Sequence, residues 1–191
     1  MSALVASESG EPSDEEVVSR VLDGDTEAYA ILVGRHRSRV FRLGMSFFRD
    51  EDDAADFSQE VFIKAYSGLG SFRGQSRFST WLLRIAYNAA INTKKRRRES
   101  ASLDDEALIG SPGTDEIHAR AETVRAVREA MAELPRRQAL CLELFFYYDL
   151  KYAEISEITG FPVNTIKSHV FRAKRLLRER LGGGSEADSA L

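Results

Sequence analysis

The chain has 191 residues, of which 43% are hydrophobic and 30% are charged, and its formal net charge is -3 at pH 7. This composition is typical of a soluble globular protein and excludes a chain that is disordered throughout. With Cys141 as its one cysteine, the chain has no intrachain disulfide and no cysteine-based metal site. It contains neither a secretory signal nor a run of about 18 uncharged apolar residues, so we expect a cytoplasmic protein without membrane insertion.

The small net charge conceals a strong segregation along the chain. Residues 8–28 hold eight acids and one base, and residues 50–60 hold six acids and no base. By contrast, residues 72–98 hold eight bases and no acid, and residues 162–181 hold six bases and one acid. Such blocks indicate one surface for a polyanion and another for a different partner, although each block taken alone is also compatible with a solvated helix face.

Helical periodicity dominates the first half of the chain. Apolar residues recur at spacings of three and four, and the alternation typical of strands is almost absent. Ser13 and Glu16 have the spacing of a capping box at the start of a first helix. A second helix is predicted to begin near Asp25, a third to run from the acidic block to Gly68, and a fourth to cover residues 81–98.

A Ser-rich, acidic stretch with Pro112 and Gly113 separates this half from a second helical half. We therefore predict an all-α fold of two small helical domains joined by a flexible linker, the second being a four-helix domain with a helix-turn-helix. The predicted boundaries are residues 13–98 for the first domain, 99–115 for the linker, 116–182 for the second domain and 183–191 for a disordered tail.

The helix-turn-helix is predicted within residues 149–181. A short helix ends at Gly160 and a longer one begins near Pro162, and in this motif the second helix enters the major groove of DNA. On a helical wheel, an apolar stripe is formed by Ile166, Val170, Ala173 and Leu177. The opposite side carries Asn164, Ser168, Phe171, Arg172 and Arg175, with Lys167 and Arg178 on the flank. Arginine and asparagine side chains can pair with the edges of guanine and adenine, so this face is predicted to read DNA. The alternative interpretation is an amphipathic helix whose polar face is only solvated.

The fourth predicted helix carries a second stripe that suits nucleic acid. Trp81, Arg84, Asn88, Asn92 and Lys95 share one side, Tyr87 lies beside them, and a basic loop with Phe72 and Phe78 precedes the helix. Aromatic, amide and basic groups together suit stacking on unpaired bases, although Trp81 and Phe78 could equally belong to the core. The run Lys94 to Arg98 is predicted to contact phosphates. Five such contacts give a slope of about -4.5 for the logarithm of the binding constant against the logarithm of salt concentration.

The acidic block begins the third predicted helix. Asp52, Asp53, Asp56, Gln59, Glu60 and Lys64 share its polar face. Acids near a helix N-terminus are favoured by the helix dipole, which is the simpler interpretation. The six acids of residues 50–60 exceed what the helix dipole requires, so the block also indicates a basic protein partner.

Three stretches together resemble an extracytoplasmic-function sigma factor, a small two-domain promoter-specificity subunit of bacterial RNA polymerase. They are DDAADFSQEVFIKAY, FRGQSRFSTWLLRIAYNAAINTKKRRR and LPRRQALCLELFFYYDLKYAEISEITGFPVNTIKSHVFRAKRLL. The resemblance implies that the first domain binds the beta-prime clamp helices of the polymerase core and the minus-ten promoter element. It implies that the second binds the minus-thirty-five element and the beta flap, and that a dedicated anti-sigma factor is a further partner.

The resemblance also assigns roles by position. The core-polymerase contact falls on Asp53, Asp56, Gln59 and Glu60. The residues assigned to binding of the minus-ten strand are Phe72, Arg73, Arg77, Phe78, Ser79, Thr80, Trp81, Arg84, Tyr87, Asn88, Asn92 and Lys95. The minus-thirty-five element falls on Asn164, Thr165, Lys167, Ser168, His169, Phe171, Arg172 and Arg175. Many members carry Asp where this chain has Asn92, and Arg where it has His169.

Energetics limit what the free chain can do. Opening about ten base-pair steps costs on the order of 14 kcal/mol, whereas stacking of one or two flipped bases returns only a few kcal/mol. The chain is therefore expected to need the polymerase core for strand opening.

Two other functions are alternative interpretations of the sequence. A stand-alone helix-turn-helix transcriptional regulator predicts a dimer on a palindromic site without polymerase. An enzyme is disfavoured, because no phosphate loop, metal-spaced cluster or nucleophile motif is present and His36, His118 and His169 are scattered. We expect no catalytic residue, no metal and no cofactor.

Overall fold

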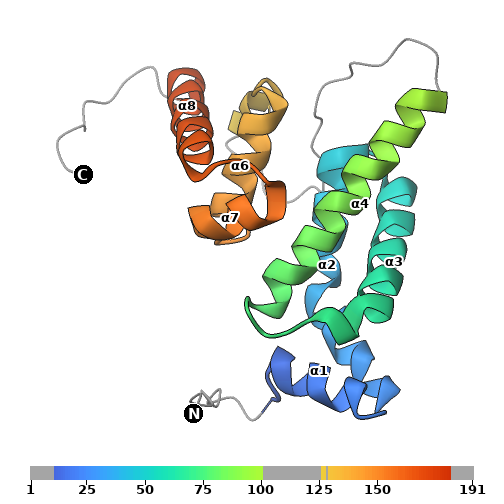
Figure 1. Ribbon diagram of the computed structural model, residues 1–191. Helices are drawn as coiled ribbons and strands as arrows, with labels where there is room; N and C mark the ends of the chain where they lie inside the picture. Colours follow the sequence, from blue (N-terminus) through green and yellow to red (C-terminus); the bar gives the residue numbers. More distant parts are fainter. Residues whose placement is uncertain (1–10, 101–125, 128, 182–191) are drawn as a thin grey trace.

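The computed structural model describes residues 11–100, 126–127 and 129–181 (Figure 1). The regular elements with complete bounds are α1 (Asp14–Leu22), η1 (Thr26–Ala28), α2 (Tyr29–Phe48), α3 (Glu51–Gly68), η2 (Leu69–Ser71), α4 (Phe78–Ser100), α6 (Arg136–Phe146), α7 (Tyr152–Thr159) and α8 (Val163–Leu181). Over these ranges the chain is helical and forms no strand, which confirms the predicted all-α class. The predicted tail and all but the first two residues of the predicted linker lie outside the described residues.

Local hydrogen bonds explain where the first helices begin. The predicted capping box is present: the Ser13 amide donates to Glu16 Oε2 at 2.7 Å, and the Glu16 amide donates to Ser13 Oγ at 3.2 Å. The side chain of Asp25 caps η1, which leads directly into α2. Asp50 caps α3 by accepting from the Asp53 amide at 2.8 Å.

Helices α1 to α4 pack around one part of the core. Arg49, with a φ of 60°, is the left-handed C-cap of α2, and α3 begins two residues later. The two helices approach closely at Gly44, where an added Cβ would lie 2.9 Å from Phe57 Cδ1 and 3.2 Å from Ala54 Cα. The largest fully buried side chains in this part are Leu32, Leu43, Leu69, Phe78, Leu82 and Leu83.

Helices α6 to α8 form the second part, together with helical residues at 126–127 and 129–132. Gly160 ends α7 in the left-handed conformation with a φ of 73°, and α8 begins three residues later. Leu144, Ile155 and Ile166 are completely or almost completely buried between the three helices. This is the predicted helix-turn-helix.

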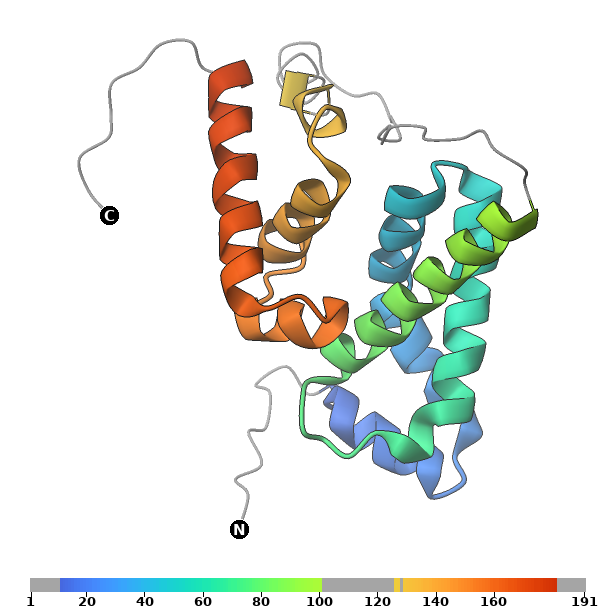
Figure 2. The same ribbon diagram turned by 45° about the horizontal axis from the view of Figure 1, so that its top comes forward.

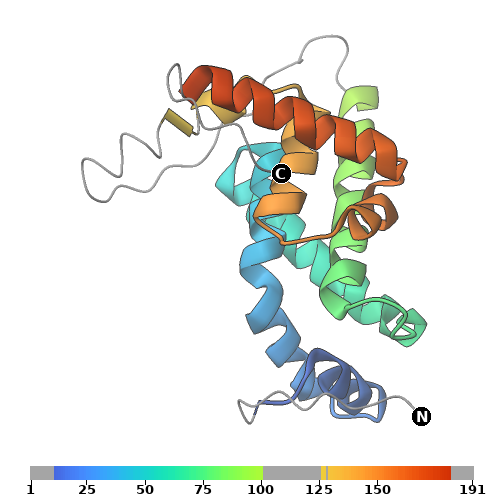
Figure 3. The same cartoon turned by 90° about the vertical axis from the view of Figure 1, so that its left-hand side faces the viewer.

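The two parts lie side by side, with α7 next to the N-terminal half of α4 (Figures 1 and 2). Seen from the side, α8 lies at the opposite end of the molecule from α1 (Figure 3). Within the described residues, no helix is both long and apolar enough to span a bilayer.

Candidate nucleic-acid interface

An aromatic cluster stabilises the start of α4 and the loop before it. The ring centroid of Phe78 lies 5.7 Å from that of Phe72 and 5.6 Å from that of Trp81, and Phe72 and Trp81 lie 5.5 Å apart. Phe78 is 0% exposed, whereas Phe72 and Trp81 are partly buried at the edge of the core. The core role that the sequence left open therefore applies to Phe78 in this structure.

The other residues assigned to the minus-ten strand divide by exposure. Thr80 and Tyr87 are buried, and Ser79 is half-buried. The exposed members are Arg73, Arg77, Arg84, Asn88, Asn92 and Lys95. The open face of α4 is consequently basic and amide-bearing, with the aromatic rings of Phe72 and Trp81 at its edge.

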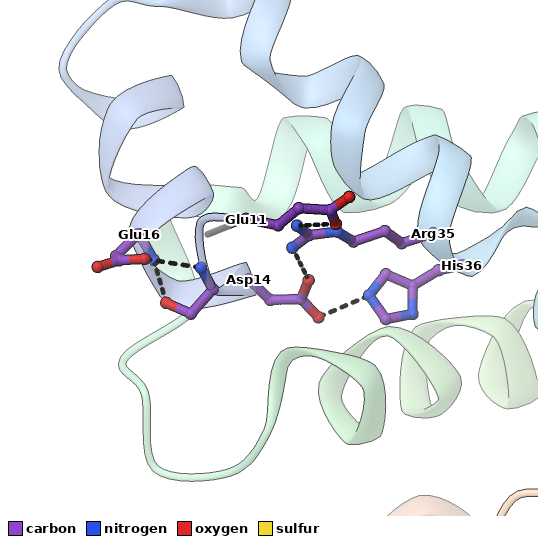
Figure 4. Close-up of polar contacts among 6 residues, drawn as sticks. Glu11, Asp14, Glu16, Arg35 and His36 are labelled. Atoms are coloured by element: carbon purple, nitrogen blue, oxygen red, sulfur yellow. Dashed lines mark hydrogen bonds and ion pairs between the residues drawn. The ribbon is translucent and has the colours of Figure 1, made fainter. Parts of the chain in front are cut away.

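The buried His36 of α2 and the half-buried Asp14 of α1 form a polar pair (Figure 4). His36 Nε2 lies 2.6 Å from Asp14 Oδ2, and the imidazole ring lies 5.4 Å from the ring of Phe78. Arg35 donates to the other carboxylate oxygen of Asp14 at 3.0 Å. Burial alone would raise the pKa of Asp14, but the hydrogen bonds from His36 and Arg35 outweigh it and lower that pKa below its ordinary value. No local pattern indicates this pair, because its members are 22 residues apart.

The acidic face of α3 is largely open to solvent. Asp56 and Gln59 are exposed, and Glu60 is half-buried and accepts from Lys64 at 2.5 Å. Ile63 lies one helical turn beyond Gln59 on the same side and is 66% exposed. Sequence reasoning missed Ile63 because an isoleucine in a helix normally belongs to the core. Tyr66, three residues further along α3, is 43% exposed, so this side of the helix shows two large apolar side chains to solvent.

Asp53, also assigned to the acidic face, is bound by the basic run at the end of α4. Both terminal nitrogens of Arg97 donate to its carboxylate, at 2.7 Å and 2.6 Å. The hydrogen bonds from Arg97 hold the pKa of Asp53 below its ordinary value. Arg97 is thus paired with an acid in this structure, and the phosphate contacts expected of this run stay a prediction.

Helix α8 exposes the face that the helical wheel selected. Ile166, Val170 and Ala173 are buried, and Leu177 is partly buried. On the opposite side the exposed residues are Asn164, Lys167, Ser168, Phe171, Arg172 and Arg175, with Thr165 half-buried. Phe171 is the most exposed large apolar residue at 67%. A basic helix with this exposed face has the geometry required for insertion into a major groove.

His169 lies between the core and the exposed face of α8. Burial, followed by the charges of Arg172 and Arg137, lowers its pKa below the ordinary value. Its Nδ1 atom is buried without a hydrogen-bond partner among the described residues, and its ring lies 6.2 Å from that of Phe161. His169 is therefore a packing residue at the edge of the exposed face of α8.

Several contacts that the sequence did not predict join the two parts. Glu143 Oε2 accepts from Ser46 Oγ at 2.6 Å, and Tyr148 Oη donates to the Arg39 carbonyl at 2.9 Å. Glu154 Oε1 accepts from Thr80 Oγ1 at 3.1 Å. We call these three hydrogen bonds the interdomain seam. No local pattern could have indicated them, because each joins residues more than 70 positions apart.

Among the residues that the structure describes, no three His, Cys, Asp or Glu side chains gather into a group that could hold a metal ion. The described surfaces differ in charge: α3 exposes acids, whereas α4 and α8 expose bases.

Comparison with known families agrees with these surfaces. Residues 32–100 match the family model "Sigma-70 region 2", and residues 124–177 match "Sigma-70, region 4". The first range contains α3 and α4 with their acidic and basic faces, and the second contains α6, α7 and all but the last four residues of α8.

Curated relatives cover most of the chain. The RNA polymerase sigma-H factor of Pseudomonas aeruginosa is 33% identical over 180 residues, which are 88% of this chain and 93% of the relative. The ECF RNA polymerase sigma-E factor of Escherichia coli K12 is 34% identical over 181 residues, which are 88% of this chain and 94% of the relative.

Solved structures share the fold. CnrH in complex with the cytosolic domain of CnrY has a TM-score of 0.65 at 23% identity, over 91% of this chain and 100% of that one. The sigma factor RpoE in complex with the anti-sigma factor NepR from Bartonella quintana has a TM-score of 0.62 at 21% identity, over 80% of this chain and 96% of that one. From the family matches and the relatives, the chain belongs to the sigma-70 family, as an alternative sigma factor of the extracytoplasmic-function type.

Proposed function

We propose that the chain binds the RNA polymerase core through α3, captures the minus-ten strand with α4 and its preceding loop, and reads the minus-thirty-five element with α8. The observation that carries this proposal is the opposite charge of two neighbouring helices. Helix α3 exposes Asp56 and Gln59 around Ile63, whereas α4 exposes Arg84 and Asn88. One unit therefore offers a surface for a protein and a surface for a nucleic acid.

The polymerase supplies what the chain lacks. Promoter opening costs on the order of 14 kcal/mol for about ten base-pair steps. The half-buried Phe72 and Trp81 offer at most a few bases a stacking surface, at about 1 to 3 kcal/mol each. The role proposed here is selection of the sequence and retention of the opened strand, without catalysis by this chain.

An anti-sigma protein is the third proposed partner. RpoE of Bartonella quintana forms a complex with the anti-sigma factor NepR, and CnrH forms a complex with the cytosolic domain of CnrY. Both proteins share the fold of this chain, which supports a partner of the same kind here.

Gel-shift assays on promoter DNA with and without purified bacterial core enzyme test the proposal. We expect a specific complex with both proteins together and none with the chain alone. Asp56→Arg is expected to weaken association with the core at least about tenfold, because it reverses a charge in the exposed acidic surface. Glu157→Arg, at an exposed acid on α7, is the matched control and should leave association unchanged. A specific dimeric complex on a palindrome without core enzyme would instead support a stand-alone regulator.

A further inference from the structure

One acid of α7 lies where the proposed DNA-binding loop meets α4. Glu154 Oε1 accepts from Thr80 Oγ1 at 3.1 Å and lies 3.8 Å from Arg77 Nε. Its side chain is 17% exposed, so little of the carboxylate is open to water. The other oxygen accepts from the Lys151 amide at 2.9 Å, which fixes the carboxylate at the start of α7.

Thr80 and Arg77 both belong to the set assigned to the minus-ten strand. A hydroxyl and a guanidinium are among the groups that bind backbone phosphates in protein–DNA complexes. A carboxylate and a phosphate are both anionic acceptors, so they compete for the same donors. While Glu154 accepts from Thr80, a phosphate cannot occupy the same position.

We propose that Glu154 acts as an internal substitute for a backbone phosphate, so that the free chain closes its own minus-ten surface with α7 and opens when DNA or polymerase separates the two parts. This inference rests on the proposed function of α4. It adds that the chain is self-inhibited by a contact between its two halves, independently of any anti-sigma protein.

The other two hydrogen bonds of the interdomain seam and a cation–π contact beside them stabilise the closed form. Ser46 donates to Glu143, Tyr148 donates to the Arg39 carbonyl, and the Arg42 guanidinium carbon lies 3.6 Å from the centroid of the Tyr147 ring. Water can replace these polar and cation–π contacts when the parts separate. The buried apolar residues of both parts belong to one continuous cluster, which adds to the stability of the closed form. Burial raises the pKa of Glu143, so its ionised form carries a desolvation cost that opening would relieve.

A reversible covalent lock tests the inference on the full chain. Arg42→Cys and Tyr147→Cys together place two thiols at exposed positions beside the seam, where a short bifunctional methanethiosulfonate can join them and dithiothreitol can release them. The native Cys141 is a poor competitor, because burial raises the pKa of its thiol to about 11. Each single-cysteine variant serves as a control for unspecific cross-linking.

We expect the locked chain to lose at least about tenfold of its promoter-specific transcription with core polymerase, and to regain it when the same sample is reduced. Absence of a cross-link would overturn the closed arrangement, and full activity of the locked chain would overturn the inhibition. An inactive wild-type chain with core enzyme would instead contradict the proposed function, so the two failures are distinguishable.

A second variant isolates the role of Glu154 and needs no transcription. Glu154→Gln removes the charge but retains an acceptor for the cap of α7. In the double-cysteine background, we expect it to slow cross-linking by about threefold to tenfold, because the closed form is populated less. Glu157→Gln removes an equivalent exposed charge from the same helix and should leave the rate unchanged. Equal rates in both variants would overturn the role of Glu154.

Discussion

Arg97 at the end of α4 forms a two-pronged ion pair with Asp53 in the first turn of α3, with nitrogen–oxygen distances of 2.6 Å and 2.7 Å. The pair joins the basic run to the acidic surface, so these two charges largely neutralise one another. The guanidinium carbon of Arg97 also lies 5.2 Å from the centroid of the Phe48 ring. The side chains of Arg97 and Asp53 are 56% and 34% exposed, so solvent screens their charges. The pair therefore contributes less than about 1 kcal/mol to stability.

This pairing predicts different salt dependences for two arginines of α4. Arg84 is exposed on the proposed DNA face, so Arg84→Ala should reduce the salt slope of promoter-complex formation by about 0.7 to 0.9. Arg97→Ala should change the slope much less, because Arg97 is already paired with Asp53. Binding titrations of the holoenzyme over a range of salt concentrations measure both slopes. A larger change for Arg97 than for Arg84 would contradict this assignment.

The close approach of α2 and α3 predicts opposite effects for two glycines of α2. Gly44→Ala should lower the free energy of unfolding by about 1 to 3 kcal/mol, because its Cβ would meet Phe57 and Ala54. Gly34 is exposed with nothing within 4 Å of its Cβ position, so Gly34→Ala should raise stability by up to about 1 kcal/mol. Urea unfolding of both variants is the measurement, and a stable Gly44→Ala variant would refute the close packing.

The exposed face of α8 predicts which of its basic side chains contacts the edges of DNA base pairs. Arg172→Ala should weaken binding to the upstream promoter element by about 1 to 3 kcal/mol and relax the preference at one base pair. Lys174 lies over the rings of Phe145 and Phe146, at 5.3 Å and 4.8 Å, so Lys174→Ala should leave sequence preference unchanged. Competition binding with a set of single-base promoter variants distinguishes them. Loss of preference in the Lys174 variant alone would reverse the proposed orientation of α8.

The Asp14–His36 pair predicts a dependence of stability on pH. Because the folded chain lowers the pKa of Asp14, the ionised carboxylate stabilises the fold above its ordinary pKa of 3.8, and this contribution is lost as the pH falls through the lowered value. Asp14→Asn should therefore cost about 1 to 3 kcal/mol near neutral pH. The difference from the wild type should shrink in acid. Unfolding curves from neutral pH down to about pH 2 test this, and a constant difference would contradict an ionised Asp14 carboxylate in the folded chain.

Local chemistry explains which parts of the fold could be predicted. The capping box of Ser13 and Glu16 involves residues three positions apart, so the sequence contains the whole interaction. The exposed face of α8 was predictable as well, because Ile166, Val170 and Ala173 form one stripe that must point to a core.

Tertiary contacts explain what could not be predicted. Helix α4 contacts α2, α3 and α7, so the sequence alone could not decide whether Phe78 and Tyr87 point into the core or towards DNA. The pairs Arg97–Asp53 and Thr80–Glu154 join positions 44 and 74 residues apart. Complementary charge made such pairs possible, but only the packing of the helices selects them.

In vitro transcription with purified bacterial core polymerase on a promoter library tests the central claim most directly. The account predicts transcripts that need both the core and this chain, and that start downstream of a shared pair of upstream elements. Transcription that is indifferent to the chain, together with dimeric binding of the chain to duplex DNA without core enzyme, would contradict it.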